Sequence, residues 1–91
     1  MTYTITVTGK GGHGSRPDLS INPIDCLAAI HLALGRLPGF QVKQINAGTS
    51  GNVIPAQAIM TFRSEASKEL ICQIMENSAK PFRCTAALNC E

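Results

Sequence analysis

The sequence has little of what several classes of protein require. It contains no tryptophan and one tyrosine, and its eight Lys and Arg residues are scattered among six Asp and Glu residues. A surface that binds nucleic acid needs clustered positive charge and stacking aromatic rings. No apolar run approaches the ~20 residues of a membrane-spanning helix, and the first residues lack the layout of a signal peptide. We therefore expect no nucleic-acid partner and no membrane partner.

Motifs for metal binding are also missing. The two histidines and six acidic residues form no H-E-x-x-H, H-x-x-E-H or H-x-D pattern, and no C-x-x-C pair occurs. The four cysteines could form two disulfides, but they lie in apolar helical or alternating segments, at Cys26, Cys72, Cys84 and Cys90. We expect reduced, buried thiols in a cytoplasmic protein, and no metal site in this chain.

The segments that are present alternate between strand-like and helix-like patterns. Tyr3, Ile5 and Val7 alternate with threonines, and the Asn22-Pro23 pair is typical of a helix start. We expect strands over residues 2–8, 40–47, 53–63 and 82–90, and helices over residues 24–37 and from a cap at Ser64 or Ser67 to the residue before Pro81. The predicted fold is α+β and ferredoxin-like, β-α-β-β-α-β, with a four-stranded antiparallel sheet and two helices on one face.

The first predicted helix and the second predicted strand indicate a further partner. The helix is apolar nearly all round, whereas covering a small sheet needs an apolar arc of only about a third of the circumference. The strand over residues 40–47 is more polar than the first strand, which is typical of a sheet edge. The excess apolar surface therefore predicts contact with another domain or a second copy.

The glycine-rich run Gly9–Gly14 follows the first strand and surrounds His13. It formally matches G-x-G-x-x-G, but no helix opens within it and no acidic residue ends the second strand, so a dinucleotide site is disfavoured. The glycines leave the imidazole little to pack against, which favours a functional role for His13, whereas His31 lies among aliphatic residues and is interpreted as structural. One alternative is a stand-alone ferredoxin-like regulatory domain whose glycine loop binds a small ligand.

Four motifs carry a resemblance to a known family. They are the stretch Gly9–Pro17 (GKGGHGSRP), then Asn22–Ile24 (NPI), Ala47–Pro55 (AGTSGNVIP) and Phe62–Arg63. The chain closely resembles the dimerisation (lid) domain of the metal-dependent aminoacylase, carboxypeptidase G and succinyl-diaminopimelate desuccinylase peptidase superfamily. Within it, the chain is most similar to amidohydrolases that cleave N-acyl amino acids, such as hippurate and auxin-conjugate hydrolases. The resemblance implies that residues 1–91 are one lid domain from a longer, two-domain enzyme, here called the parent.

The resemblance also implies roles for three residues and for parts of the parent outside this chain. All three would act on the partner subunit's active site: His13 would stabilise an oxyanion there, Asn52 would bind substrate across the dimer, and Arg63 would hold the substrate carboxylate. The catalytic domain of the parent would carry two divalent metal ions, usually zinc, so the isolated chain would not be active. A homodimer would form through the first helix and the edge strand, over a small-molecule amide substrate.

Overall fold

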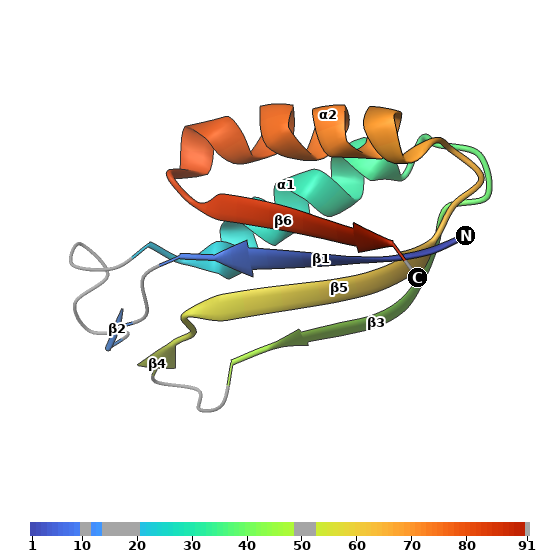
Figure 1. Ribbon diagram of the computed structural model, residues 1–91. Coiled ribbons are helices and arrows are strands. Elements are labelled where there is room, and N and C mark those ends of the chain that lie inside the picture. The colour runs from blue at the N-terminus through green and yellow to red at the C-terminus, as the bar shows by residue number, and fades with distance from the viewer. Residues whose placement is uncertain (10–11, 14–20, 49–52, 91) are drawn as a thin grey trace.

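A computed structural model describes residues 1–9, 12–13, 21–48 and 53–90 of the chain. The described strands are β1 (Thr2–Thr8), β2 (Gly12–His13), β3 (Gln41–Ala47), β4 (Val53–Ile54), β5 (Gln57–Arg63) and β6 (Thr85–Cys90). The helices are α1 (Pro23–Leu34), α2 (Lys68–Ala79) and the short 3-10 helix η2 (Lys80–Phe82). Figure 1 shows both α-helices on one face of the main sheet, with the opposite face uncovered. The ferredoxin-like α+β prediction is confirmed.

The main sheet is antiparallel, in the order β3-β5-β1-β6. β1 lies between β5 and β6, and its Ile5 is opposite Met60 on β5 and Leu88 on β6. β3 is an edge strand, as the polar pattern of residues 40–47 predicted, and its register shifts between Val42 and Gln44. The shift explains the imperfect alternation of this strand, since a bulge inserts one extra residue into the ladder.

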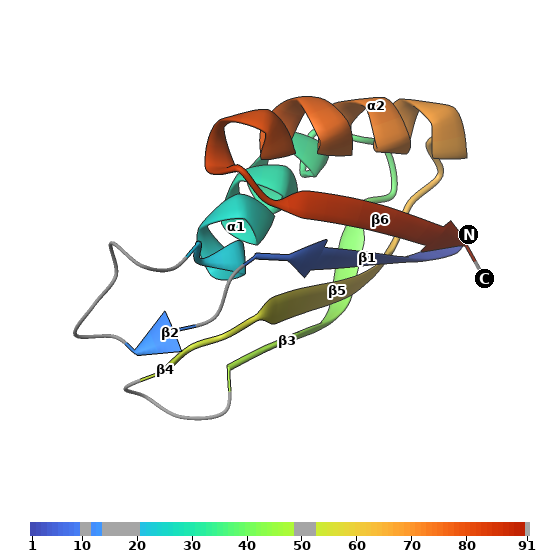
Figure 2. The ribbon, with the colours of Figure 1, turned by 60° about the vertical axis from the view of Figure 1, so that its left-hand side comes forward.

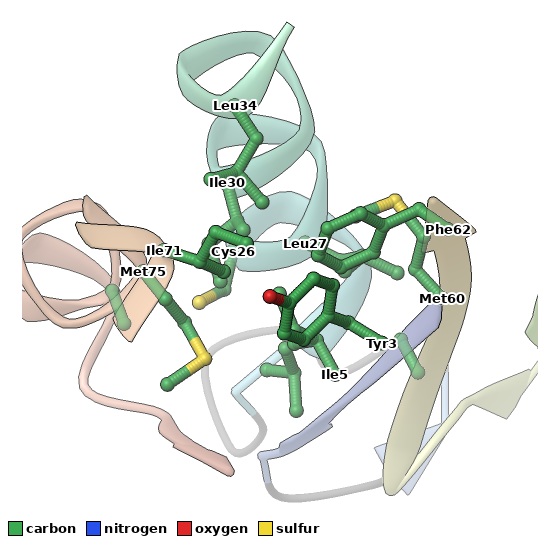
Figure 3. Packing of buried hydrophobic residues seen from close by; sticks show 13 residues of the cluster. Tyr3, Ile5, Cys26, Leu27, Ile30, Leu34, Met60, Phe62, Ile71 and Met75 are labelled. Atoms are coloured by element: carbon green, nitrogen blue, oxygen red, sulfur yellow. The ribbon is translucent and has the colours of Figure 1, made fainter. Parts of the chain in front are cut away.

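The core lies between the sheet and the two α-helices (Figure 3). The alternating residues of β1 point into it, and the ring of Tyr3 stacks on that of Phe62 with centroids 5.5 Å apart. The phenol oxygen of Tyr3 donates a hydrogen bond to the carbonyl of Ala66 at 3.1 Å, so its one polar group is satisfied. α1 packs over β1 and β5, and α2 packs over β6. Neither α-helix of the described part is long and apolar enough to cross a membrane.

The helix starts follow the predicted caps. The side chain of Asn22 accepts a hydrogen bond from the Ile24 amide at 3.0 Å, with Pro23 in the first turn. Of the two candidate caps of α2, Ser67 is the one used, because its hydroxyl accepts from the Leu70 amide at 3.2 Å.

The C-terminal boundary of α1 and the start of the last strand differ from the prediction. α1 ends at Leu34 instead of residue 37, where the chain turns before Phe40. The last strand begins at Thr85 instead of residue 82, because η2 and a left-handed Arg83 (φ 59°) lie between α2 and β6. A left-handed residue cannot continue a strand, so pairing with β1 starts only after it.

The predicted third strand, residues 53–63, is two strands. β4 and β5 are separated at Pro55 and Ala56, and Ala56 is exposed instead of facing the core with Ala58. Proline has no amide hydrogen to donate to a ladder, which accounts for the break. β4 instead pairs with β2 in a separate two-stranded sheet.

Candidate functional site

The small sheet of β2 and β4 brings together two motifs that are forty residues apart in sequence. Gly12 lies opposite Ile54 and His13 opposite Val53, in antiparallel register. Val53 directly follows Asn52, which itself lies outside the described residues. The backbone of His13 therefore sits beside the chain that leads from Asn52. His13 and the strand that follows Asn52 lie at the same end of the molecule (Figure 1).

Gly9 fixes the base of the loop that carries His13. Its amide donates to the carbonyl of Ala56 at 2.9 Å, which extends the pairing of β1 with β5 by one residue. A Cβ at Gly9 would overlap the carbonyl oxygen of Ile21 and would lie 3.0 Å from the Cδ of Pro23. Only glycine allows the exit of β1 and the entry of α1 to pass this closely. Gly9 after β1 and Ile21 before α1 are thereby held close together.

The small sheet lies at one end of the molecule, and the chain termini lie at the other (Figures 1 and 2). Thr8, at the end of β1, pairs with Gln57 near the small sheet, whereas Thr2 pairs with Arg63. Six residue steps along a strand span about 20 Å. Arg63 is exposed at the terminal end of β5, so the structure does not bring it together with His13 in one chain.

A second feature is an apolar groove between α1 and β3. Its volume is about 310 Å³, and it is lined by Ile24, Leu27, Ala28, His31, Leu32 and Ile45. Leu32 is 73% exposed, Ile45 53% and Ile24 42%, although all three are apolar. Ile45 lies opposite the buried Met60, on the side of the sheet that carries the helices. The two helices leave this edge of the main sheet uncovered, and Figure 1 shows β3 as the strand of that sheet farthest from them.

The described residues offer no metal site, and three of their thiols have a raised pKa. No group of three His, Cys, Asp or Glu among them could hold a metal ion, so this part of the chain does not fit a metal centre. Burial raises the pKa of Cys26 to about 11, with a further contribution from Cys84. Burial also raises the pKa of Cys72 and of Cys84. These three thiols remain protonated near neutral pH and do not act as nucleophiles.

The sequence pattern predicts a loop for the glycine-rich run and one strand over residues 53–63, and it does not predict β2, the separation of β4 from β5 or the close contact at Gly9. Two-residue strands have no detectable period, and their pairing depends on tertiary structure. The glycine content was the available signal, since glycine within or next to a strand often marks a close backbone approach.

Comparison with known proteins identifies relatives of the chain. The family model for the peptidase dimerisation domain matches residues 1–80. The chain is 40% identical over 78 residues to succinyl-diaminopimelate desuccinylase of Pseudomonas syringae, covering 72% of this chain and 20% of that protein. It is 35% identical over 79 residues to N-acetylcysteine deacetylase of Bacillus subtilis, covering 70% of this chain and 21% of that protein.

A solved structure also matches. The Bacillus subtilis YXEP protein, described as a dinuclear metal-binding peptidase of the M20 family, superposes with a TM-score of 0.71 at 26% identity. The match covers 97% of this chain and 24% of that one. The chain spans about a fifth of the length of the two relatives that it matches by sequence.

Proposed function

Because this chain belongs to the peptidase dimerisation domain family of the M20 metal-dependent hydrolases, we propose that it caps and dimerises a parent amidohydrolase. The proposed substrates are N-acyl amino acids or peptides, cleaved at an amide bond. Two relatives carry the names of a deacetylase and a desuccinylase, both of which remove an acyl group. The comparisons do not favour a stand-alone regulatory domain that binds a small ligand.

One observation carries the proposed mechanism: the small sheet with His13 lies at the end of the molecule opposite the termini. In a longer protein the remaining chain continues from the terminal end. The catalytic domain of the same subunit would then attach far from His13, and the active site within reach of His13 would belong to the partner subunit. This supports action across the dimer for His13 and for Asn52.

The chemistry of an imidazole suits that position. A ring N–H that points at a carbonyl oxygen stabilises the negative charge that develops there in the transition state, and one such donor contributes about 10²–10³ in rate. We propose this role for His13 and a hydrogen bond to substrate for Asn52. We propose that the catalytic domain of the parent binds the metal ions, and the described residues of this chain offer no group of ligands for one.

If Arg63 binds the substrate carboxylate, we assign it to a different active site of the dimer from the one that His13 of the same chain serves. It lies at the terminal end of β5, opposite Thr2 and beside Gln41 on β3. We therefore propose that Arg63 serves the active site of its own subunit, while His13 and Asn52 serve the partner's site. A planar guanidinium suits a carboxylate because it can form two parallel hydrogen bonds.

The proposed dimer contact is formed by α1 and β3. β3 has one edge available for strand pairing, and the groove beside it exposes Ile24, Leu32 and Ile45. A second copy related by two-fold symmetry would continue the sheet through β3 and fill the groove with its own α1. We also propose a cytoplasmic location, which fits the free thiols of Cys26, Cys72 and Cys84.

Replacing His13 in the parent enzyme tests this function. We expect His13→Ala to retain the dimer and the bound metal while kcat falls about 10²–10³-fold through the loss of one oxyanion donor. His13→Asn, which keeps an N–H donor, should recover part of that loss. A parent enzyme with His13→Ala that is dimeric and turns over at the normal rate would contradict the proposed role.

A further inference from the structure

Among the described residues that line the groove between α1 and β3, one has a titratable side chain, His31. The imidazole is half-buried and meets the ring of Phe40 edge-on, with centroids 5.6 Å apart and an interplanar angle of 68°. Phe40 in turn packs on Phe62 of the core, with centroids 5.4 Å apart. One side of the imidazole is therefore held against the ring of Phe40, and the side chain forms part of the groove wall.

No carboxylate is among the described residues that line this groove. The charged side chains on the surrounding elements lie outside the lining: Asp25 and Arg36 on α1 and the turn after it, Lys43 on β3, Arg63 at the end of β5, Glu65 beside Gly39, and Lys68, Glu69 and Glu76 on α2. Of these, Lys68, Glu69 and Glu76 line a separate groove on the outer side of α2. An imidazolium at His31 would thus face apolar side chains once the groove is covered.

We infer that His31 makes self-association of this chain pH-dependent, with the neutral imidazole buried against a second copy and the protonated one favouring the monomer. The inference rests on the α1–β3 dimer contact of the proposed function. Desolvation disfavours the charged form of a buried histidine, so the monomer binds protons that the dimer excludes. Two-fold symmetry buries both copies of His31, and the effect therefore acts twice.

The size of the effect follows from proton linkage. An ordinary histidine titrates near pH 6.5, so an interface that excludes imidazolium loses a factor of about 11 in affinity per histidine at pH 5.5. At pH 7.5 the corresponding factor is about 1.1. For two histidines, the dissociation constant of the dimer should rise up to about 100-fold between pH 7.5 and pH 5.5. Ordinary carboxylates remain ionised over this range, so histidine is the responding group among the described residues that line the groove.

Sedimentation velocity of the 91-residue chain at pH 7.5 and pH 5.5 tests the inference. The wild-type dimer should dissociate at the lower pH. His31→Gln, and His31→Leu, which makes this part of the groove lining apolar, should show no such response. The sequence has two histidines, so His13→Gln is the matched control and should respond like wild type. A pH response that persists in both His31 variants, or its absence in wild type, would overturn the inference.

Leu32→Ala separates this inference from the proposed contact. If Leu32→Ala weakens the dimer at pH 7.5 while dissociation of the wild-type dimer does not depend on pH, the α1–β3 contact is supported and the role of His31 is wrong. If Leu32→Ala leaves the dimer unchanged, the contact is wrong and the inference fails with it. A wild-type chain that remains monomeric at pH 7.5 at every concentration contradicts both.

Discussion

Truncation of Leu32 on the outer face of α1 should weaken the dimer and leave the monomer intact. Leu32 is 73% exposed in the single chain, so its side chain contributes little to the fold of the monomer. Burying most of a leucine side chain against a partner is worth about 1–2 kcal/mol. Because the contact occurs twice in a two-fold dimer, Leu32→Ala should cost about 2–4 kcal/mol, or about a 30- to 1,000-fold higher dissociation constant.

The chain offers a matched control on its other helix. Leu70 of α2 is also an exposed leucine, at 41%, but it lies outside the α1–β3 groove. Sedimentation velocity across a concentration series should give a weakened dimer for Leu32→Ala and an unchanged one for Leu70→Ala. Circular dichroism should show the same helix content in both variants. An unchanged dissociation constant for Leu32→Ala, or an equal loss for Leu70→Ala, would refute the assigned contact.

Two further predictions concern the base of the site and the core. Gly9→Ala should lower the free energy of unfolding by about 1–3 kcal/mol, since the added methyl overlaps the Ile21 carbonyl. The control is Gly35→Ala, whose added methyl would lie 3.5 Å from the backbone carbonyl oxygen of His31, an ordinary contact. In urea titrations at matched protein concentration, this control should leave the free energy of unfolding unchanged or raise it. Equal free energies of unfolding for the two variants would contradict the close packing at Gly9. Burial raises the pKa of Cys26 from about 9 in the unfolded chain to about 11, so wild type should lose stability as pH rises from about 9 to about 11. The Cys26→Ala variant should lose less stability over that pH range. If the free energies of unfolding from urea denaturation fall equally with pH in wild type and variant, the assignment of a buried neutral thiol is wrong.

Much of the main sheet followed from local patterns. The alternation of Tyr3, Ile5 and Val7 with threonine marks β1, because only a half-buried strand gives a period of two. Asn22 and Pro23 mark the start of α1, because an acceptor side chain and a fixed φ satisfy the first turn. These signals act within a few residues, so the sequence alone reports them.

The boundaries that were wrong depend on backbone geometry that side-chain patterns do not encode. Arg83 adopts a left-handed conformation that nothing in its residue type favours, and it delays the last strand to Thr85. Pro55 was expected at the entry of one strand and instead separates β4 from β5. The pairing of His13 with Val53 is long-range and involves two residues on each side, so no periodicity reveals it.

The candidate site was predicted by resemblance alone. The motifs around His13 and Asn52 point to one site in that way, and the β2–β4 pairing brings the backbone of His13 beside Val53, the residue after Asn52. The distance of Arg63 from that site was not predicted, because the direction of β5 relative to β1 decides at which end of the sheet Arg63 lies. The roles of all three residues remain predictions.

Mixed dimers of two inactive subunits test whether His13 acts across the dimer. One subunit of the parent enzyme carries His13→Ala with an intact catalytic domain, and the other carries an intact lid with an inactivated catalytic domain. After exchange at equal amounts, half of the dimers are mixed and each has one complete site, so about a quarter of wild-type turnover should return. The same pairing with Arg63→Ala should stay inactive, because that residue is assigned to its own subunit. Mixed dimers that form, as native mass spectrometry would show, and yet recover no activity with His13→Ala would contradict the assignment of His13 to the partner's site.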